Sequence, residues 1–390
     1  MGNTGNAPLP PLTMRRTLVS AALLSLVFAQ APIVREDKRA FAVLDPLGPF
    51  RNGSELYEPA QTNLTPPYFQ VYDDRFMDII GPNPTLRVIV ENDTFPFAHD
   101  GPIWVPSTNE VFMTGGRLQG RPVSKISLDD LKTTTTGLIN FTMVPLGPDV
   151  QINNGGTPFR GDLLFVTTGN GTLPPSVIRV NPNAPFNDTI ILNSFYGRQF
   201  NSLNDVKIHP QSRAIFFTDV TYGFLNNFRP APQLPNQVYR FDADTGDVRV
   251  VADGFVQPNG IAFSLDGSRA YIADSGQSEG VQGGTDPTLP GTIYEFDVLP
   301  GSQRFANRRV FAFTDTGVPD GLTLDTEGNF FVGCPDGAQV YSPDGTLLGK
   351  IFLGQGSANM IFANGTGLLL MADTKVFLAE IAAQGANLQL

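Results

Sequence analysis

The sequence predicts an all-β fold, a six-bladed β-propeller, because one structural unit recurs along the chain. Each copy begins with a residue whose side chain carries an oxygen, continues into an alternating apolar strand, makes a tight turn and enters a second apolar strand. A repeat of about 40–60 residues built only of strands is typical of propellers. Three copies are clear and three are weaker: residues 204–219, 259–274 and 320–333, then 100–113, 154–166 and 359–371.

Composition supports the same class. The 390 residues include 40 glycines and 33 prolines, which favour many tight turns, and no long stretch has helical periodicity. Length alone would suggest two or three domains, but six blades of about 50 residues form one closed unit. Equivalent positions of successive blades face one another around a central axis. The residues that open the six repeats are therefore expected to be neighbours: Asp100, Asn154, Asn204, Asn259, Asp320 and Asn359.

The first element predicted is an export signal over residues 1–31. Arg15 and Arg16 precede an apolar run from Leu18 to Ala29, which ends in the small-x-small pattern Ala29-Gln-Ala31. The run is too short to span a membrane, and the alternative is a buried N-terminal helix. Seven Asn-x-Ser/Thr sequons fit a secreted glycoprotein: Asn52, Asn63, Asn92, Asn140, Asn170, Asn187 and Asn364.

A proline-rich N-terminal arm over residues 32–85 is expected to lead into the propeller domain, residues 86–390. Residues 86–91 form a good strand by their β-branched content. The blades are expected to begin near residues 98, 152, 202, 257, 318 and 357. Because the last blade supplies only three strands of its own, residues 86–91 are predicted to complete it and close the ring. Residues 276–291, rich in glycine, are expected to form a long loop that lines one face.

Charge and motifs exclude several functions. The net charge is −11, and no basic patch stands out, so a nucleic-acid partner is disfavoured and cations are favoured. Gly276-Gln-Ser278-Glu-Gly280 matches a nucleophile elbow by letters only, because neither a helix nor a histidine follows it. The single cysteine, Cys334, cannot form an intrachain disulfide and is expected to be a buried, inert thiol.

The residues that remain offer oxygen atoms to a metal ion. Carboxylates and amide carbonyls suit Ca²⁺ or another hard divalent cation, which accepts six to eight such oxygens, waters included. Asp100 and Asp320 with the carbonyls of Asn204 and Asn259 would leave positions for water and substrate. Taken singly, each of these residues is a common turn former. Their recurrence at the step into the first strand of successive repeats favours a shared site.

At these residues the chain resembles the gluconolactonase/regucalcin family of calcium-dependent six-bladed propellers, and within it the fungal lactonohydrolases. The resemblance lies in Tyr196–Val206, Phe216–Phe224 and Asn236–Asp242, with lesser support from Leu347–Ile351. It implies a secreted carboxylic ester hydrolase that opens aldonolactones or pantoyl lactone to hydroxy acids. It also implies that Ca²⁺ is held by Asp100, Asn204, Asn259 and Asp320. Family members usually carry Glu where this chain has Asp100, which is one methylene shorter.

The resemblance implies that a carboxylate takes a proton from the attacking water. Asp320 is the first candidate for this general base, and Asp205 and His99 are weaker candidates; His99 is also interpretable as a structural histidine. Trp104 and Tyr222 are candidates for the pocket wall or the core. Two alternatives stay open: a propeller that binds calcium and a sugar or protein partner without catalysis, and a phosphotriester hydrolase at the same site. No membrane partner is expected after removal of the signal.

Overall fold

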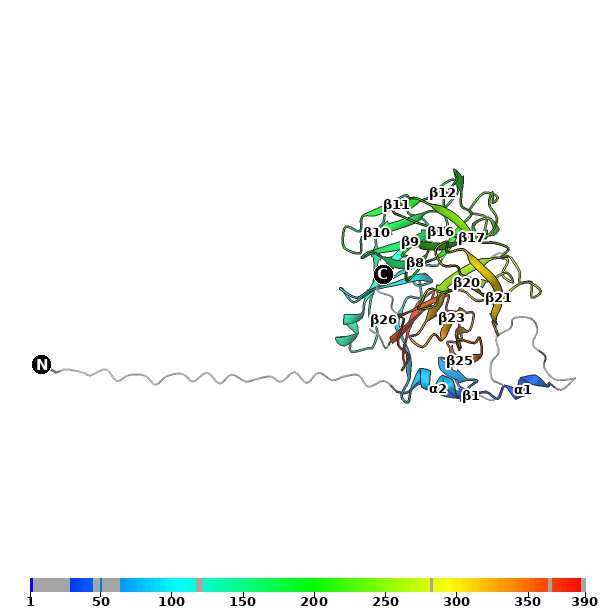
Figure 1. Cartoon of the computed structure of the whole chain (residues 1–390). Helices are drawn as coiled ribbons and strands as arrows, with labels where there is room; N and C mark the ends of the chain where they lie inside the picture. The colour runs from blue at the N-terminus through cyan, green and yellow to red at the C-terminus, as the bar shows by residue number, and fades with distance from the viewer. Residues whose placement is uncertain are drawn as a thin grey trace.

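The computed structural model describes residues 1–2, 29–44, 50, 64–116, 122–280, 283–363 and 367–386. Most of the predicted export signal, residues 3–28, lies outside the described residues, as do the sequons at Asn52, Asn63 and Asn364. Within the described ranges, no helix combines the length and the apolar character needed to cross a bilayer. The strands form six antiparallel blades around one centre, so the predicted six-bladed β-propeller is confirmed (Figure 1).

The first three blades follow the chain order from the inner to the outer strand. Blade 1 contains β4 (Asp100–Val105), β5 (Glu110–Thr114), β6 (Val123–Ser127) and β7 (Phe141–Val144). Blade 2 contains β8 (Asn153–Phe159), β9 (Asp162–Thr167), β10 (Val177–Val180) and β11 (Asp188–Leu192). Blade 3 contains β14 (Leu203–Ile208), β15 (Ile215–Asp219), β16 (Gln237–Phe241) and β17 (Val248–Ala252).

The last three blades begin where the repeats predict. Blade 4 contains β18 (Pro258–Phe263), β19 (Arg269–Asp274), β20 (Thr292–Val298) and β21 (Phe305–Phe313). Blade 5 contains β22 (Leu322–Leu324), β23 (Phe330–Cys334), β24 (Gly337–Tyr341) and β25 (Leu347–Phe352). Blade 6 contains β26 (Asn359–Ala363), β27 (Gly367–Ala372), β28 (Lys375–Glu380) and β3 (Thr85–Glu91).

The core lies between neighbouring blades because successive side chains of a strand point to opposite faces of its sheet. Phe216 packs with blade 4 residues such as Ile261, whereas the next residue, Phe217, packs with blade 2 residues such as Val166. The inner strands β4, β8, β14, β18, β22 and β26 each contact the next around the ring. This apolar packing fixes the inner strands and therefore the residues at their ends.

The N-terminal strand β3 closes the ring as predicted. It pairs antiparallel with β28, and Val90 lies opposite Val376. Blade 6 thereby gains a fourth strand, and the outer edge of β28 is covered. The sheet of blade 6 is thus completed from the two ends of the described chain.

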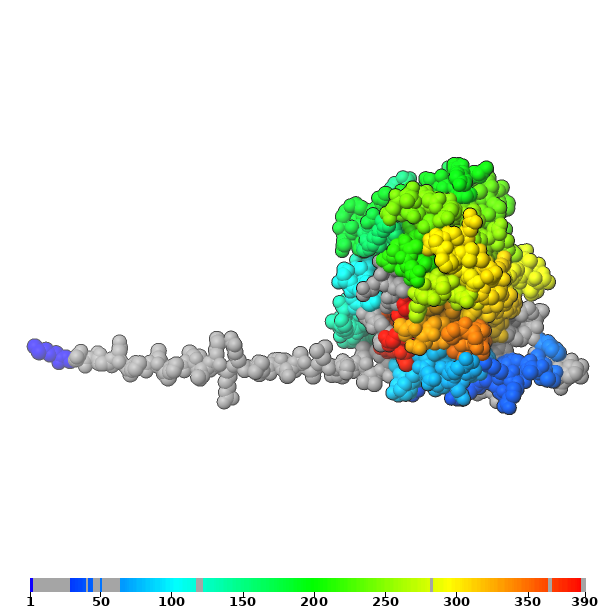
Figure 2. All heavy atoms as spheres, in the orientation of Figure 1, coloured from blue at the N-terminus to red at the C-terminus, as the bar shows by residue number. Residues whose placement is uncertain are grey.

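The N-terminal arm also contributes strands to blade 5. Strand β2 (Tyr68–Val71) pairs antiparallel with β25, and β1 (Ile33–Arg35) pairs parallel with β2. Figures 1 and 2 show the arm along the bottom of the molecule, where helix α2 (Arg75–Ile80) contacts β25 and the short helix α1 (Arg39–Ala42) lies further out. Phe69 and Phe76 are fully buried there. Blade 5 therefore has six strands, in contrast to four in each other blade.

The two faces of the ring differ. We call the end at which the inner strands begin the upper face. At this end the second and third strands of blades 3 and 4 are joined by residues 220–236 and 275–291, whereas blades 5 and 6 use only residues 335–336 and 373–374. Helix α3 (Tyr222–Leu225) lies within the blade 3 connection, and a hairpin of β12 (Ser194–Phe195) and β13 (Arg198–Gln199) precedes blade 3. The longest of these upper connections thus belong to blades 3 and 4.

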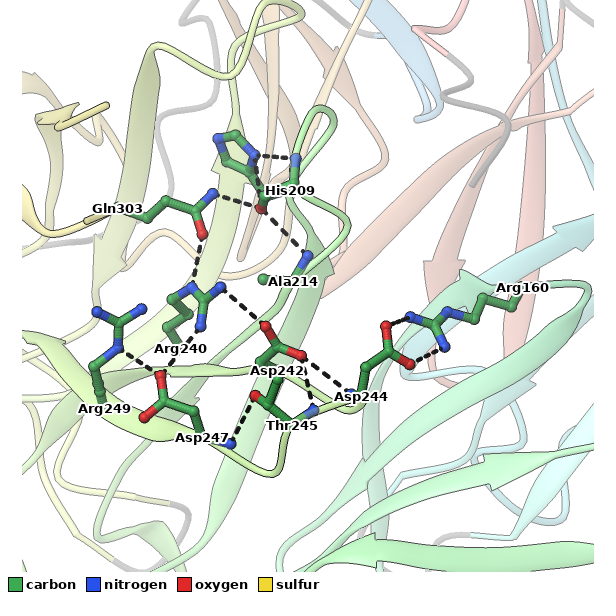
Figure 3. A network of polar contacts seen from close by, with 11 residues as sticks. Arg160, His209, Ala214, Arg240, Asp242, Asp244, Thr245, Asp247, Arg249 and Gln303 are labelled. Carbon is green, nitrogen blue, oxygen red and sulfur yellow. Dashed lines mark hydrogen bonds and ion pairs between the residues drawn. The ribbon is translucent and has the colours of Figure 1, made fainter. Parts of the chain in front are cut away.

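The opposite, lower face is held by polar contacts between turns (Figure 3). Arg240, which is largely buried, donates to Gln303 and forms ion pairs with Asp242 and Asp247. His209 forms a hydrogen bond with the carbonyl oxygen of Gly267 at 2.9 Å, so this histidine joins the turns of blades 3 and 4. A 3-10 helix, η2 (Leu128–Lys132), follows β6 in blade 1. These groups tie blades to one another away from the upper face.

Candidate metal centre

The six polar residues that open the repeats lie at the upper ends of the six inner strands, or immediately before them. Side-chain hydroxyls link successive steps, because Thr114 donates to the carbonyl oxygen of Asn154 and Thr218 donates to that of Asn259. Between blades 6 and 1, the amide of Asn359 donates to the carboxylate of Asp100 at 2.7 Å. The backbone segments that carry these residues are therefore neighbours around the ring, as the repeat predicts.

Asp100 is 3% exposed and enters the ring at a slightly different register. Asp100 lies opposite Thr114 in blade 1. The equivalent pair in blade 3 is Leu203 opposite Asp219, so Asp100 corresponds to Leu203, the residue before Asn204. The Oδ1 atom of Asp100 accepts hydrogen bonds from the Gly101 N–H and from Asn359, each at 2.7 Å. Neither bond uses Oδ2. The side chain is thus fixed at one oxygen, and its second oxygen is the one that can serve a ligand.

Asn204 and Asn259 each present a carbonyl oxygen that lacks a donor. Both residues are 5% exposed, and neither Oδ1 atom has a hydrogen-bond partner among the described residues. The amide of Asn259 is oriented by its nitrogen, which donates to Ser275 Oγ at 3.1 Å. A buried acceptor without a donor costs about 1–3 kcal/mol unless something else satisfies it. A bound cation would satisfy both oxygens.

Asp320 lies on the step that leads into β22 and is half-buried. Its backbone N–H donates to the carbonyl oxygen of Gly333 at 2.8 Å, which anchors the step to β23. A Cβ atom at Gly260 would collide with the carbonyl oxygen of Asp320, so glycine is required there for blades 4 and 5 to approach. The backbone of Asp320 is therefore held tightly beside that of Asn259.

Asp205 lies at the inner surface of the ring and bridges three blades. Its Oδ1 accepts the Val206 N–H and lies 3.3 Å from Lys207 Nζ, while its Oδ2 accepts the N–H of Ile261 in blade 4 at 3.1 Å. On the other side, a Cβ atom at Gly155 of blade 2 would collide with it. Burial raises the pKa of Asp205; Lys207 opposes this shift and the charge of Asp100 adds to it.

His99 lies beside the step of blade 1 and is oriented by a carboxylate. Its Nδ1 is 2.7 Å from Asp373 Oδ1, at the tight upper turn of blade 6. A carboxylate accepts a proton donor, so Nδ1 carries the proton in this pair and Nε2 is left as the basic nitrogen of the neutral ring. The sequence did not indicate Asp373, because its partner is distant along the chain.

Trp104, Tyr222 and Cys334 lie in or beside the packed core. Trp104 packs beside the core between blades 6 and 1, and its Nε1 donates to Asn109. Tyr222 is 8% exposed within α3. Cys334 is buried, as expected, and burial raises the pKa of its thiol well above the usual value.

The donor set fits an oxygen-coordinated divalent cation. Within the described ranges no group of three or more His, Cys, Asp or Glu side chains is arranged to hold a metal, so a site of those ligands alone is absent there. Two carboxylates with two donor-free amide oxygens match the ligand preferences of Ca²⁺ better than those of Zn²⁺. The residues that would hold it are Asp100, Asn204, Asn259 and Asp320.

Comparison with known proteins places this arrangement in one family. The model of the SMP-30/Gluconolactonase/LRE-like region matches residues 175–372. Lactonohydrolase oryL from Aspergillus oryzae is 27% identical over 330 residues, covering 78% of this chain and 72% of that protein. A gluconolactonase from Zymomonas mobilis is 29% identical over 215 residues, covering 53% of this chain and 56% of that protein.

Solved structures share the fold. A gluconolactonase from Xanthomonas campestris superposes with a TM-score of 0.65 at 22% identity, covering 81% of this chain and 95% of that chain. Regucalcin from Agrobacterium tumefaciens, a calcium-binding protein, gives 0.55 at 17% identity and covers 76% of this chain and 96% of that chain. At such identities the comparison shows a shared propeller fold. The match covers almost the whole of each neighbour's chain.

Proposed function

The chain belongs to the SMP-30/Gluconolactonase/LRE-like family, and from this premise we propose that it is a secreted, calcium-dependent lactonase. The substrate class is an aldonolactone or pantoyl lactone, which hydrolysis converts to a hydroxy acid. The observation that carries the proposal is the pair of buried, donor-free amide oxygens of Asn204 and Asn259. The step of Asn259 adjoins that of Asp320, in a family whose named relatives include lactonohydrolases and gluconolactonases.

When bound, Ca²⁺ would polarise the lactone carbonyl and offset the negative charge that develops on its oxygen. The chain's own residues divide the remaining work. Asp100 is oriented by Asn359, and the amide of Asn259 is oriented by Ser275, so both would present their oxygens without reorganisation. Such preorganisation favours the charged transition state over the neutral substrate.

Asp320 is our first candidate to take the proton of the attacking water. It lies half-buried at the upper face, on the step that leads into β22. His99 is the second candidate, because Asp373 holds the proton on Nδ1 and leaves Nε2 basic. Asp205 is less suited, since backbone N–H groups occupy both of its oxygens and it is 1% exposed. Its contacts support a role in spacing blades 2 to 4.

Secretion and N-glycosylation are part of the same proposal. Among the described sequons, Asn140, Asn170 and Asn187 are exposed, which glycosylation requires. Asn92 is half-buried, and its side chain accepts hydrogen bonds from Thr94.

The test is hydrolysis of D-pantoyl lactone and glucono-δ-lactone, followed by pH-stat. The protein is assayed after treatment with EGTA and again with added Ca²⁺. We expect turnover that EGTA removes and Ca²⁺ restores. Turnover of a phosphotriester but of no lactone would assign the site to phosphotriester hydrolysis. A folded sample that binds Ca²⁺ and hydrolyses neither would favour a propeller that only binds a partner.

A further inference from the structure

Two aspartates outside the proposed ligand set occupy the same place in blades 3 and 4. Asp219 ends β15 and Asp274 ends β19, and they are the last residues of the two repeats that supply the asparagine ligands. Both are 0% exposed. They lie opposite Leu203 and Pro258, the residues immediately before Asn204 and Asn259. The lactonase mechanism gives neither of them a task.

Asp219 binds the backbone that leads into the step of blade 3. Its Oδ1 accepts the N–H groups of Asn201 at 2.9 Å and Ser202 at 2.8 Å, and its Oδ2 accepts that of Asn201 at 3.0 Å. Ser202 in turn accepts the N–H of Gly223, from the long upper connection of blade 3, at 2.9 Å. One carboxylate thus fixes the two residues that lie three and two positions before Asn204.

Asp274 makes the same kind of contact in blade 4. Its Oδ2 accepts the N–H of Val256 at 3.1 Å, and its Oδ1 accepts that of Gln257 at 2.7 Å. These residues lie three and two positions before Asn259. The two blades therefore repeat one device: a buried carboxylate at the end of the second strand receives consecutive backbone N–H groups of the approach to the ligand.

Blades 1, 2 and 5 lack this carboxylate, and in blade 6 the matching Asp373 contacts His99 of blade 1. Thr114 in blade 1 and Thr167 in blade 2 hold the matching ladder positions. In blade 5 the residue two places beyond the Leu322–Val332 pair is Cys334. A neutral residue is thus sufficient to build a blade. Both blades that provide neutral amide ligands have the carboxylate.

Burying these charges costs solvation free energy, and among the described residues no close cation offsets that cost. The nearest ion-pair partner of Asp274 is Arg308, whose Nη2 is 3.9 Å away. The guanidinium of Arg229, near Asp219, donates instead to carbonyl oxygens, including those of Gly171 and Leu173. A buried carboxylate without a close cation destabilises a fold unless its hydrogen bonds compensate. Its retention at both positions points to a gain outside fold stability.

Building on the proposed calcium site, we propose that Asp219 and Asp274 are positioning residues that set the backbone of the Asn204 and Asn259 steps and thereby tighten divalent-cation binding. An amide oxygen attracts a cation less strongly than a carboxylate does, so its contribution depends more on its placement. Residues that orient metal ligands commonly change metal affinity about 10–100-fold when they are replaced. Asp219 and Asp274 would act one shell further out, through the main chain.

The experiment is calorimetric titration of Ca²⁺ into EGTA-treated, dialysed protein, with wild type, Asp219→Asn and Asp274→Asn. We expect the Kd for Ca²⁺ to rise about 10-fold or more in each variant, with every ligand still present. Asp274→Glu, which keeps the charge but moves the carboxylate, is expected to weaken binding in the same direction, and it serves if an Asn variant does not fold. Thermal denaturation with and without Ca²⁺ gives a second readout, in which the stabilisation by Ca²⁺ shrinks.

The matched control is Asp325→Asn. Asp325 is 2% exposed, and its Oδ1 accepts the backbone N–H groups of Glu327 and Asn329, but it lies in a lower turn of blade 5. Its loss is expected to lower the Tm and leave the Kd for Ca²⁺ unchanged. If wild type binds Ca²⁺ and the Asp219 and Asp274 variants bind it equally well, the positioning role is overturned alone. If wild type binds no Ca²⁺, the proposed metal site is overturned and this inference falls with it.

Discussion

Blades 3 and 4 hold their metal steps differently from blade 5. In blades 3 and 4 a buried carboxylate receives the backbone N–H groups of the approach. In blade 5 the Asp320 N–H donates to the Gly333 carbonyl, and the charge lies on the fully buried Lys350 of the outer strand, which pairs with Asp315 and Asp336. Asp315 lies on the connection that leads to Asp320. The blades therefore hold the backbone of these steps by different means: a buried carboxylate in blades 3 and 4, and a main-chain hydrogen bond in blade 5.

The largest effect is expected from Asp320→Asn, which removes a ligand charge and the first candidate for the general base. We expect kcat/KM on the best lactone to fall by about 10²–10⁴-fold, because general-base catalysis contributes that much. The measurement is initial rates at saturating Ca²⁺, with Asp325→Asn as the control in the same blade. Activity equal to wild type would exclude Asp320 as the general base and make His99 the first candidate.

Lys350→Met tests the support of blade 5. Lys350 Nζ lies 2.7 Å from Asp336 Oδ2, and Asp336 is 1% exposed, so the substitution leaves a buried carboxylate without its partner. We expect the free energy of unfolding to fall by about 3–5 kcal/mol. Urea denaturation measures it. Lys125→Met, which breaks the half-buried pair with Glu110 in blade 1, is the control and is expected to cost about 1 kcal/mol or less. An equal loss of unfolding free energy in the two variants would show that the buried pair of Lys350 is no more important for stability than the half-buried pair of Lys125.

The dependence of stability on pH tests the protonation state of Asp219. Burial raises the pKa of Asp219 from 3.8 to about 7. The folded protein therefore keeps a proton that the unfolded chain releases, so this group's stabilisation is complete below the unfolded pKa and is lost as pH rises through about 7. In EGTA, wild-type Tm should decline across this window. Asp219→Asn should flatten the decline, and an unchanged slope would show that Asp219 is already ionised throughout.

The smallest effect is expected on the lower face. Arg160 forms a bidentate ion pair with Asp244, and the two side chains are 44% and 66% exposed (Figure 3). Arg160→Ala should lower the free energy of unfolding by about 0.2–1 kcal/mol, because exposed pairs gain little in water. Urea denaturation at low and high salt tests this. A loss as large as that of Lys350→Met would mean that the lower turns support the ring as strongly as blade 5 does.

The repeat carried enough information to predict the propeller, the start of each blade to within a few residues, and the closing strand. Local patterns determine these features: strand, turn and strand recur, and residues 86–91 are rich in β-branched residues. The pairing of the arm with blade 5 was not predictable, because Tyr68–Val71 has no feature that selects β25 among six outer strands. The choice depends on shape and on what remains uncovered after folding.

For the site, the repeat predicts that Asp100, Asn204, Asn259 and Asp320 lie near one another, because propeller symmetry converts repeat position into proximity. It did not indicate the partners that orient them. Asn359 was only the opening residue of a weak repeat, yet its amide orients Asp100. Asp219 and Asp274 closed the two clearest repeats, but a carboxylate that accepts backbone N–H groups leaves no spacing rule to detect. Such contacts depend on where a loop returns, which composition does not specify.

The double attachment of the N-terminal residues has a consequence for biosynthesis. Strands β2 and β3 leave the ribosome first, yet their partners β25 and β28 are among the last segments to emerge. Blades 1 to 4 contain only segments that are neighbours in the chain, so they can form in order during translation, while β3 waits beside an incomplete ring. Closure therefore waits until β25 and β28 have been synthesised. A product truncated before β25 would leave β2 and β3 without partners and expose their edges.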